Sequence, residues 1–470
     1  MAYTKLPLTF GIEIETIFLF HEDRLQQVLD TYSPPAEIVR QHSEAHLTGL
    51  RHKAYINFPY NSWGIRASDG HEDTVKPTVS DNVGEYRAYK DEPLRVVQNL
   101  VAAIPGRENV SVHYRYEKQD KYDDWSINSD GTLYGLTKEE MVKTFSDRVP
   151  SLQIAEAWDS YGAEFVSPPY SDLDLLREDT RVILTKVQGD ATSHHGAIAN
   201  DTCGFHVHVG LPKNDKFSLL TLQHLASLLV TFEDQISLLH APSRRNVTGA
   251  DCAEIVSNRE NFFLEGEIKL VDHNGKKLKQ LYQDLSTIKA TLLNLTKEAP
   301  TNTTVESPHT KQEHAATEPH LRDASQKALA DLLDRIGKRK GHVVNFSGLV
   351  KDGRPNTVEF RQHAGTTDAE EMYWWVRFCT GMVQLAHRYA STGEGCPIES
   401  WTDDRGVEVL FELMGFPSEG REFYKRKMEA YATAEGEEAE HVGVFIEADE
   451  FDIEDWEVQE GLQHLGVEGE

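Results

Sequence analysis

Alternating apolar and polar residues predict β-strands at several separated points of the chain. Residues 8–19 (LTFGIEIETIFL) are rich in aromatic and β-branched residues and predict the first strand. Residues 110–116, 162–169 and 203–210 predict further strands, the second of which ends at two prolines. Residues 356–365 predict another strand, which we expect to form a hairpin with residues 343–350 across a turn at Asp352–Gly353.

Apolar residues at helical spacing predict helices over residues 92–104, 173–187, 217–240, 278–295 and 368–389. The stretch 217–240 is so rich in leucine that we expect one long buried helix, with its leucines in the core. Strands and helices in this irregular order predict an α+β fold.

The remaining stretches predict how the domain is organised. Residues 30–90 are rich in Pro, Gly, Ser, Asn and Asp, and residues 299–320 in Pro and Thr, so both are expected to be insertions, the second disordered. No Lys or Arg follows Lys427, and the dense Asp and Glu beyond it predict a flexible acidic tail. We therefore expect one catalytic domain over residues 1–430 and a tail over residues 431–470.

Charge and cysteine content narrow the class of protein. The net charge of −29 argues against a nucleic-acid-binding or anionic-membrane surface. No apolar run is long enough to span a bilayer. The four cysteines, without CxxC spacing, are typical of a reduced cytosolic protein: Cys203, Cys252, Cys379 and Cys396.

The first strand carries two candidate metal ligands. Alternation places Glu13 and Glu15 on one face and apolar Ile12 and Ile14 on the other. Neighbouring carboxylates repel each other unless a cation lies between them, and Mg²⁺ prefers such hard oxygen ligands. The alternative is an edge strand with a solvated acidic face. Glu164, the carboxylate of the 162–169 strand, is a third candidate for the acidic face.

The stretch 203–210 (CGFHVHVG) places His206 and His208 on one face of a strand, with Val207 and Val209 behind them. A single histidine on a strand is usually structural. Two of them, framed by glycines that permit close backbone approach, could instead hold a transition metal or donate hydrogen bonds to an anion.

The strand at 356–365 (NTVEFRQHAG) has Glu359, Arg361 and His363 on one face and apolar Val358 and Phe360 on the other. Charged groups are costly to bury unpaired, so we expect the charged face to meet water, polar groups or a ligand. An ion-paired surface strand is the alternative. In the loop after the 217–240 helix, an arginine pair is either solvated or contacts phosphate: Arg244 and Arg245.

In their order along the chain, these segments resemble the fungal amidoligase-enzyme family, which is similar to the glutamine synthetase and glutamate–cysteine ligase superfamily. The resemblance covers residues 8–390 and rests on GIEIE at 11–15, DGTL at 130–133 after a tryptophan, GAEFVSP at 162–168, CGFHVHVG at 203–210 and TVEFRQHAGT at 357–366. It implies a glutamine synthetase-like core, in which a curved, mainly antiparallel sheet binds Mg-ATP on its inner face and helices pack outside.

The resemblance also implies roles for individual residues. The metal carboxylates are expected to be Glu13, Glu15, Glu164 and Glu359. His206 is expected beside a metal, with His208 a weaker candidate, and Arg361 is expected to meet the transferring phosphate. Nucleotide-contact candidates without a closer assignment are Asp130, Arg244 and Arg245.

The chemistry of these residue types suits an ATP-dependent ligase. Forming an amide from a carboxylate and an amine requires the carboxylate to be activated as an acyl phosphate, and phosphoryl transfer requires charge neutralisation by divalent metals and arginine. We therefore expect ATP and Mg²⁺, with Mn²⁺ as an alternative, a small-molecule or peptide carboxylate and an amine donor. The chain has no Walker A or GxGxxG stretch, so we expect the sheet to hold the nucleotide.

Other functions use the same residue types. A metallohydrolase or oxygenase would hold Zn²⁺ or Fe²⁺ with His206, His208 and a carboxylate. A non-catalytic relative would bind a nucleotide or an amino-acid-like ligand as a sensor, and a phosphagen-kinase-like enzyme would transfer phosphate to a guanidino group. The sequence leaves the two substrates and the oligomeric state open.

Overall fold

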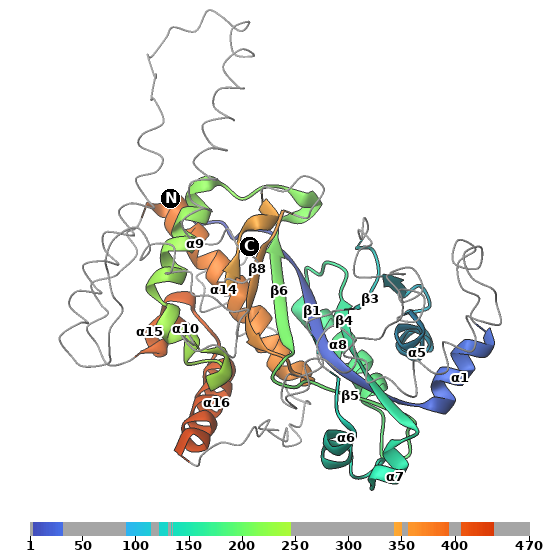
Figure 1. The fold of residues 1–470 in the computed structure, drawn as a ribbon. Helices are drawn as coiled ribbons and strands as arrows, with labels where there is room; N and C mark the ends of the chain where they lie inside the picture. Colours follow the sequence, from blue (N-terminus) through green and yellow to red (C-terminus); the bar gives the residue numbers. More distant parts are fainter. Residues whose placement is uncertain are drawn as a thin grey trace, which may run out of the picture. The chain divides into compact units, whose positions relative to one another are not determined.

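A computed structural model describes most of the elements that carry the candidate residues (Figure 1). It describes residues 3–31, 91–113, 122–129, 133, 135–245, 343–349, 356–393 and 406–436. Asp130, Cys252, Cys396, the turn at Asp352–Gly353, the 278–295 helix and the 299–320 insertion lie outside these ranges, as does most of the 30–90 insertion.

The fold is α+β, as predicted. In the described residues eight strands pair mostly antiparallel, with one parallel pair, and helices accompany them. The likeness of the core to glutamine synthetase stays a prediction.

The described chain divides into two compact units, each built from segments that are distant in sequence. The N-terminal unit comprises residues 11–207 and 364–375, and the C-terminal unit comprises residues 1–10, 208–363 and 376–470. The single catalytic domain over residues 1–430 stays a prediction.

In the N-terminal unit, β1 (Thr9–His21) is a central strand. It pairs antiparallel with β4 (Trp158–Val166) and with β5 (His195–Ile198), and β6 (Gly204–Gly210) lies beside it. β4 pairs in turn with β3 (Ser126–Ser129), which pairs in parallel with β2 (Ser111–His113). The strands that carry Glu13, Glu164 and His206 are therefore neighbours.

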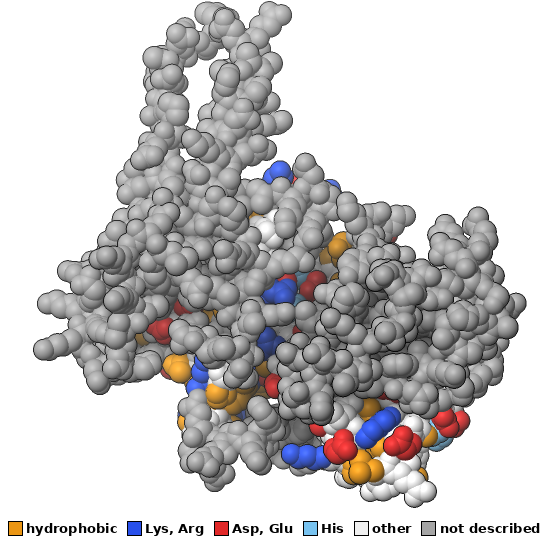
Figure 2. Space-filling model, viewed as in Figure 1, with side chains coloured by type: hydrophobic (Ala, Val, Ile, Leu, Met, Phe, Trp, Pro, Cys, Tyr) orange, Lys and Arg blue, Asp and Glu red, His pale blue; other side chains and the backbone are white. Residues whose placement is uncertain are grey.

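Helices of the same unit pack against these strands. α5 (Asp91–Ala102) contacts α1 (Glu22–Thr31), α8 (Leu173–Gln188) and β2, and α8 contacts β5 (Figure 1). α6 (Lys138–Thr144) and α7 (Leu152–Ala155) pack together. Buried residues of these two helices and of β1 share one core, which includes Ile17, Leu19, Met141, Phe145 and Trp158. Over α6 and α7, Figure 2 shows acidic, basic and hydrophobic side chains interspersed, so the outer side of this pair has mixed character.

The C-terminal unit contains β7 (Val344–Asn345), β8 (Val358–Ala364) and the end of β6. β7 and β8 pair antiparallel, which confirms the predicted hairpin partners. The described helices of the C-terminal unit are α9 (Leu219–Thr231), α10 (Glu233–Ser237), most of α14 (Ala369–Thr392), α15 (Val407–Met414) and α16 (Ser418–Gly436). An aromatic cluster joins the last three helices through Phe378, Phe411, Phe416 and Tyr424.

One expectation about the helices is wrong. The predicted 217–240 helix is two helices, because the chain leaves helical geometry at Phe232 (φ −95°, ψ 11°), directly after β-branched Val230 and Thr231. Its leucines are nevertheless mostly core residues, as expected. His363 meets polar groups, one of the surroundings expected for the charged face of β8, since it is buried against Lys427 and His240.

Other predictions were right to within a few residues. The structure confirms β1, β2, β4, β6, β8, α5, α8 and α14, and it adds β3, β5, α1, α6, α7, α15 and α16. α16 extends to Gly436, so the first residues of the predicted tail are helical. Within the described part of the chain, no helix has the length and hydropathy needed to cross a membrane.

Candidate active site

Three side chains of the N-terminal unit converge from three neighbouring strands: Glu13 of β1, Glu164 of β4 and His206 of β6. One possible ligand atom of each lies within 4.8 Å of the others. His206 Nδ1 is 3.1 Å from Glu13 Oε2. Period-two alternation, together with the pairing of β1 and β4, places the two carboxylates on the same face. The structure therefore brings together three of the residues that the sequence singled out.

Glu15 lies on the same face of β1 as Glu13, and its carboxylate is close to the His206 ring. Its side chain is buried, with one oxygen accepting a hydrogen bond from the Gly204 amide and the other 3.7 Å from His206 Nε2. The imidazole thus has a carboxylate on each side. At 3.7 Å the contact of Glu15 with Nε2 is electrostatic rather than a hydrogen bond, so Glu15 restrains the imidazole through its charge while Nδ1 lies toward Glu13. Glu15 is therefore a positioning residue in this geometry.

Asn128 completes the surroundings of Glu164, and the sequence analysis missed it. Its Nδ2 donates to Glu164 Oε2 at 3.2 Å, and the two residues are direct partners in the pairing of β3 with β4. The pattern Ser126-Ile127-Asn128 alternates, so its polar face was visible in the sequence. Only the strand register, however, places Asn128 opposite a carboxylate.

The donor set is two carboxylates and one imidazole. Carboxylate oxygens suit Mg²⁺ and Mn²⁺, and imidazole extends the range of suitable metals toward transition metals. An ion-paired histidine without a metal would use the same contacts. With Glu15, three carboxylates surround one imidazole in this unit, which is more negative charge than a single ion-paired histidine needs. Surplus negative charge on one face of a sheet is unfavourable without a cation.

The C-terminal unit contributes a second group on β8 and β7. Arg361 forms an ion pair with Glu359, and Asn345 Nδ2 donates to the other Glu359 oxygen at 2.7 Å. Asn345 and Glu359 are partners across the β7–β8 pair. The side chains of Glu359 and Arg361 are 12% and 21% exposed, so both charges are partly shielded from water and need each other. Sequence reasoning did not anticipate Asn345.

His208 belongs to the same unit as Glu359. Its Nδ1 lies 3.2 Å from Thr357 Oγ1, the hydroxyl at the start of the 357–366 segment. Close approach of the two segments requires Gly210, because a Cβ there would lie 3.1 Å from the Thr357 methyl and 3.3 Å from the Asn356 carbonyl. The glycine that frames the histidine pair therefore has a packing role.

The arginine pair after α10 has structural partners. Arg245 Nε donates to the His240 carbonyl at 3.0 Å, and its guanidinium lies over the Tyr431 ring of α16. Arg244 ends the 3₁₀ helix Pro242–Arg244. Their role as phosphate contacts stays a prediction.

His363, the third member of the predicted charged face, belongs to a buried basic group. Lys427 Nζ lies 3.2 Å from His363 Nε2, and the His240 ring packs edge-on to His363. Burial, reinforced by the neighbouring positive groups, lowers the pKa of His240 well below its ordinary value. All three residues are buried, so they belong to the core of the unit.

Comparison with known proteins agrees with the order of these motifs. A family model with the description "Putative amidoligase enzyme" matches residues 6–256, just over half of the chain. The chain belongs to the amidoligase enzyme family. Membership implies a ligase. Searches of curated proteins and of solved structures found no match.

The matched residues of this family member contain Glu13, Glu15, Asn128, Glu164 and His206, the whole cluster of the N-terminal unit. Glu359 and Arg361 lie beyond the matched region. Their assignment therefore rests on the resemblance of the 357–366 segment and on the geometry of β8.

Proposed function

We propose that the protein is an ATP-dependent carboxylate–amine ligase, which forms an amide or isopeptide bond through an acyl phosphate. The convergence of Glu13, Glu164 and His206, in a chain that belongs to the amidoligase enzyme family, is the observation that carries this proposal. A ligase of this kind must neutralise triphosphate charge, and a compact cluster of carboxylates is how proteins recruit the divalent ion that does so.

The donor set fits Mg²⁺ or Mn²⁺. Glu13, Glu164 and the Nδ1 atom of His206 would hold the ion, and Glu15, 3.7 Å from Nε2, would keep the imidazole in place through its charge. Bound there, such an ion supplies charge neutralisation for phosphate oxygens. The contribution of the chain is to keep three carboxylates and one imidazole at fixed positions on neighbouring strands.

The reaction has two steps. An oxygen of the substrate carboxylate attacks the γ-phosphorus of ATP, so that a new P–O bond forms and the bond to ADP breaks. The nitrogen of the amine then attacks the acyl carbon, and inorganic phosphate leaves with the former carboxylate oxygen. The nitrogen loses a proton as the amide forms.

Arg361 is proposed to offset charge on the transferring phosphoryl group. Its guanidinium is positioned by Glu359, which Asn345 holds from the other side. A planar guanidinium with several donors suits phosphate oxygens better than an ammonium does. Glu359 and Asn345 thereby orient the arginine before substrate arrives, which is the basis of electrostatic preorganisation. The resemblance also implies a metal-ligand role for Glu359, and this role is part of the proposal.

The proposal is tested by ADP release from Mg-ATP, with pools of amino acids, polyamines and ammonia as candidate substrates. We expect release that depends on both a carboxylate and an amine, and that Glu13→Gln and Glu359→Ala abolish. Arg181→Gln serves as a surface control, because its ion pair with Glu178 lies on an exposed turn of α8. No ADP release together with no thermal shift on adding Mg-ATP would refute the ligase proposal, and tightly bound stoichiometric zinc or iron would favour a hydrolase or oxygenase.

A further inference from the structure

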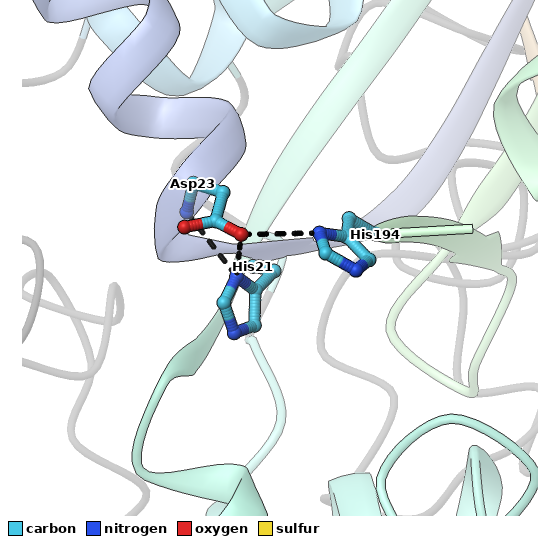
Figure 3. A group of neighbouring side chains, drawn as sticks. All are labelled: His21, Asp23 and His194. Atoms are coloured by element: carbon cyan, nitrogen blue, oxygen red, sulfur yellow. Dashed lines mark hydrogen bonds and ion pairs between the residues drawn. The ribbon is translucent and has the colours of Figure 1, made fainter. Parts of the chain in front are cut away.

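A second group of potential metal ligands lies at the far end of β1. His21 ends β1, Asp23 is in the first turn of α1, and His194 directly precedes β5 (Figure 3). Asp23 Oδ2 is 3.3 Å from Nδ1 of His21 and 3.3 Å from Nδ1 of His194. One ligand atom of each residue lies within 4.8 Å of the others. His21 is eight positions along the strand from Glu13, about 26 Å at 3.3 Å per residue, so this is a separate site.

The backbone and a buried tryptophan hold the two imidazoles in place. The His21 amide donates to the His194 carbonyl at 3.0 Å, and Trp158 is the β4 partner of His21. The Trp158 ring, which is buried, meets both imidazoles edge to face, at centroid distances of 5.3 and 6.3 Å. Ligands that rest on paired strands and a packed ring are preorganised, so binding a metal requires little reordering.

The carboxylate of Asp23 lies between the two imidazoles. Its Oδ2 atom is 3.3 Å from Nδ1 of each histidine, so one carboxylate oxygen and two ring nitrogens face one another. The Asp23 amide also lies 3.2 Å from His21 Nδ1. An imidazole nitrogen has a single lone pair, so a metal ion bound to His21 Nδ1 would take the place of that amide contact.

The spacing also suits a small tetrahedral ion. Two ligand atoms that each lie 2.0–2.1 Å from a tetrahedral zinc ion are about 3.3 Å apart. Both histidine-to-aspartate distances are 3.3 Å. Two imidazoles and one carboxylate are a common zinc ligand set and leave a fourth position for water. Mg²⁺, which prefers six oxygen ligands, is poorly served by two nitrogens.

We propose that His21, Asp23 and His194 form a binding site for Zn²⁺ or a similar transition-metal ion. The ion would join the start of α1 to the last residue of β1 and to the residue before β5. It would thereby fix the first helix against the sheet of the N-terminal unit. The site shares no residue with the proposed active site and does not depend on the proposed function.

The test is Zn²⁺ uptake by the full chain after EDTA treatment and dialysis, measured by metal analysis and titration calorimetry in excess Mg²⁺. His194→Gln and Asp23→Asn are the informative variants, because both side chains are more than half exposed and their loss leaves the fold intact. His113→Gln is the matched control, since His113 lies on β2 of the same unit and contacts Ser111 rather than a carboxylate. Co²⁺ provides a second readout through the visible absorption of tetrahedral cobalt.

We expect wild type and His113→Gln to bind one more Zn²⁺ per chain than His194→Gln and Asp23→Asn. The tetrahedral Co²⁺ spectrum should be lost in the same two variants and retained in Glu13→Gln. Equal zinc uptake by wild type and His194→Gln, or no zinc uptake by any of the four proteins, would overturn the proposal. Neither outcome bears on ADP release, so the two proposals fail separately.

Discussion

Glu15 and Glu164 are direct partners across the antiparallel pair of β1 and β4. Like charges at such positions destabilise a sheet unless other groups neutralise them. Here Glu15 accepts from the Gly204 amide and lies near the His206 ring, and Glu164 accepts from Asn128. One imidazole among three carboxylates leaves an excess of negative charge, so the strand pair is expected to be more stable when a cation is present.

Glu164→Gln tests whether the excess of negative charge around His206 destabilises the protein in the absence of a metal ion. Glutamine keeps an oxygen that accepts from Asn128 while it removes one negative charge. In EDTA we expect the variant to be more stable than wild type by about 0.2–1 kcal/mol, since a repulsive cross-strand pair is lost. With Mg²⁺ or Mn²⁺ the order should reverse, because the variant loses a metal ligand. Urea unfolding of both proteins in EDTA and in metal measures these two stability differences. An equal metal-induced stabilisation of wild type and variant would contradict a ligand role for Glu164.

Arg361→Lys tests the guanidinium on β8. Lysine keeps the positive charge near Glu359 but loses the planar set of donors, so we expect kcat for ADP formation to fall on the order of a hundredfold or more. Thermal stability should change little. Arg177→Lys is the matched control, because Arg177 pairs with Glu370 at a site where both side chains are about 40% exposed. Such a pair contributes about 1 kcal/mol or less. Similar kcat losses in both variants would remove Arg361 from the active site.

Gly204→Ala tests the close approach of β6 to Glu15. A Cβ at position 204 would lie 2.7 Å from His206 Nε2 and 3.1 Å from Glu15 Oε2, so both side chains must move. We expect a loss of about 1–3 kcal/mol in unfolding free energy, as in overpacked sites, and a weakened dependence of activity on metal concentration.

Gly11→Ala is the control for that change, because a Cβ at position 11 meets only ordinary contacts, the nearest being Ser167 Oγ at 3.6 Å. Its stability and metal dependence should match wild type. If Gly204→Ala behaved like Gly11→Ala in both assays, Glu15 would not be positioning His206.

Asp159 on β4 predicts a specific pH dependence of stability. Burial raises the pKa of its carboxyl well above the ordinary value of 3.8, although Lys138 and the Ser160 amide act in the opposite direction. Because the folded pKa lies above the unfolded one, the folded state binds more protons between the two values. The contribution of Asp159 to stability is therefore fully present below 3.8 and is lost as pH rises through the folded pKa.

Asp159→Asn removes that titration and keeps an oxygen that can accept from the Ser160 amide. We expect the variant to be more stable than wild type at neutral pH and equally stable near the ordinary aspartate pKa. Guanidinium unfolding at a series of pH values measures the difference. A difference that does not depend on pH would show that the charge of Asp159 is not the cause.

Periodicity predicted most of the strands because one face of each is strongly apolar. Ile12 and Ile14 of β1 are buried beneath Glu13, and Val358 and Phe360 of β8 are buried beneath Glu359. The break at Phe232 was not predictable from the same signal, since apolar residues at helical spacing continue on both sides of it, at Leu228 and Leu229 before the break and at Ile236 and Leu239 after it. β3 and β5 are four residues long and too short to show a period.

The candidate residues could be named from the sequence, but their partners could not. Glu13, Glu164 and His206 stand out by type and spacing. Asn128 and Asn345 acquire a role only through strand register, because each lies opposite a glutamate on the next strand. The same holds for His21 and His194, which are distant in sequence and meet only because β1 pairs with β5.

The backbone contact between Gly365 and Cys203 determines how changes in chain length affect the two motif segments. The Gly365 amide donates to the Cys203 carbonyl at 2.7 Å, and a Cβ at Gly365 would lie 2.3 Å from that of Cys203. A backbone hydrogen bond thus joins the start of the 203–210 segment to the end of the 356–365 segment. This contact is the same whatever number of residues lies between the two segments in sequence. Doubling the length of an intervening segment costs only about 0.6 kcal/mol of closure free energy. Insertions into the loops between the two motifs are therefore inexpensive, and a search for related genes should fix the glycine that matches Gly365 and leave the spacing between the motifs free.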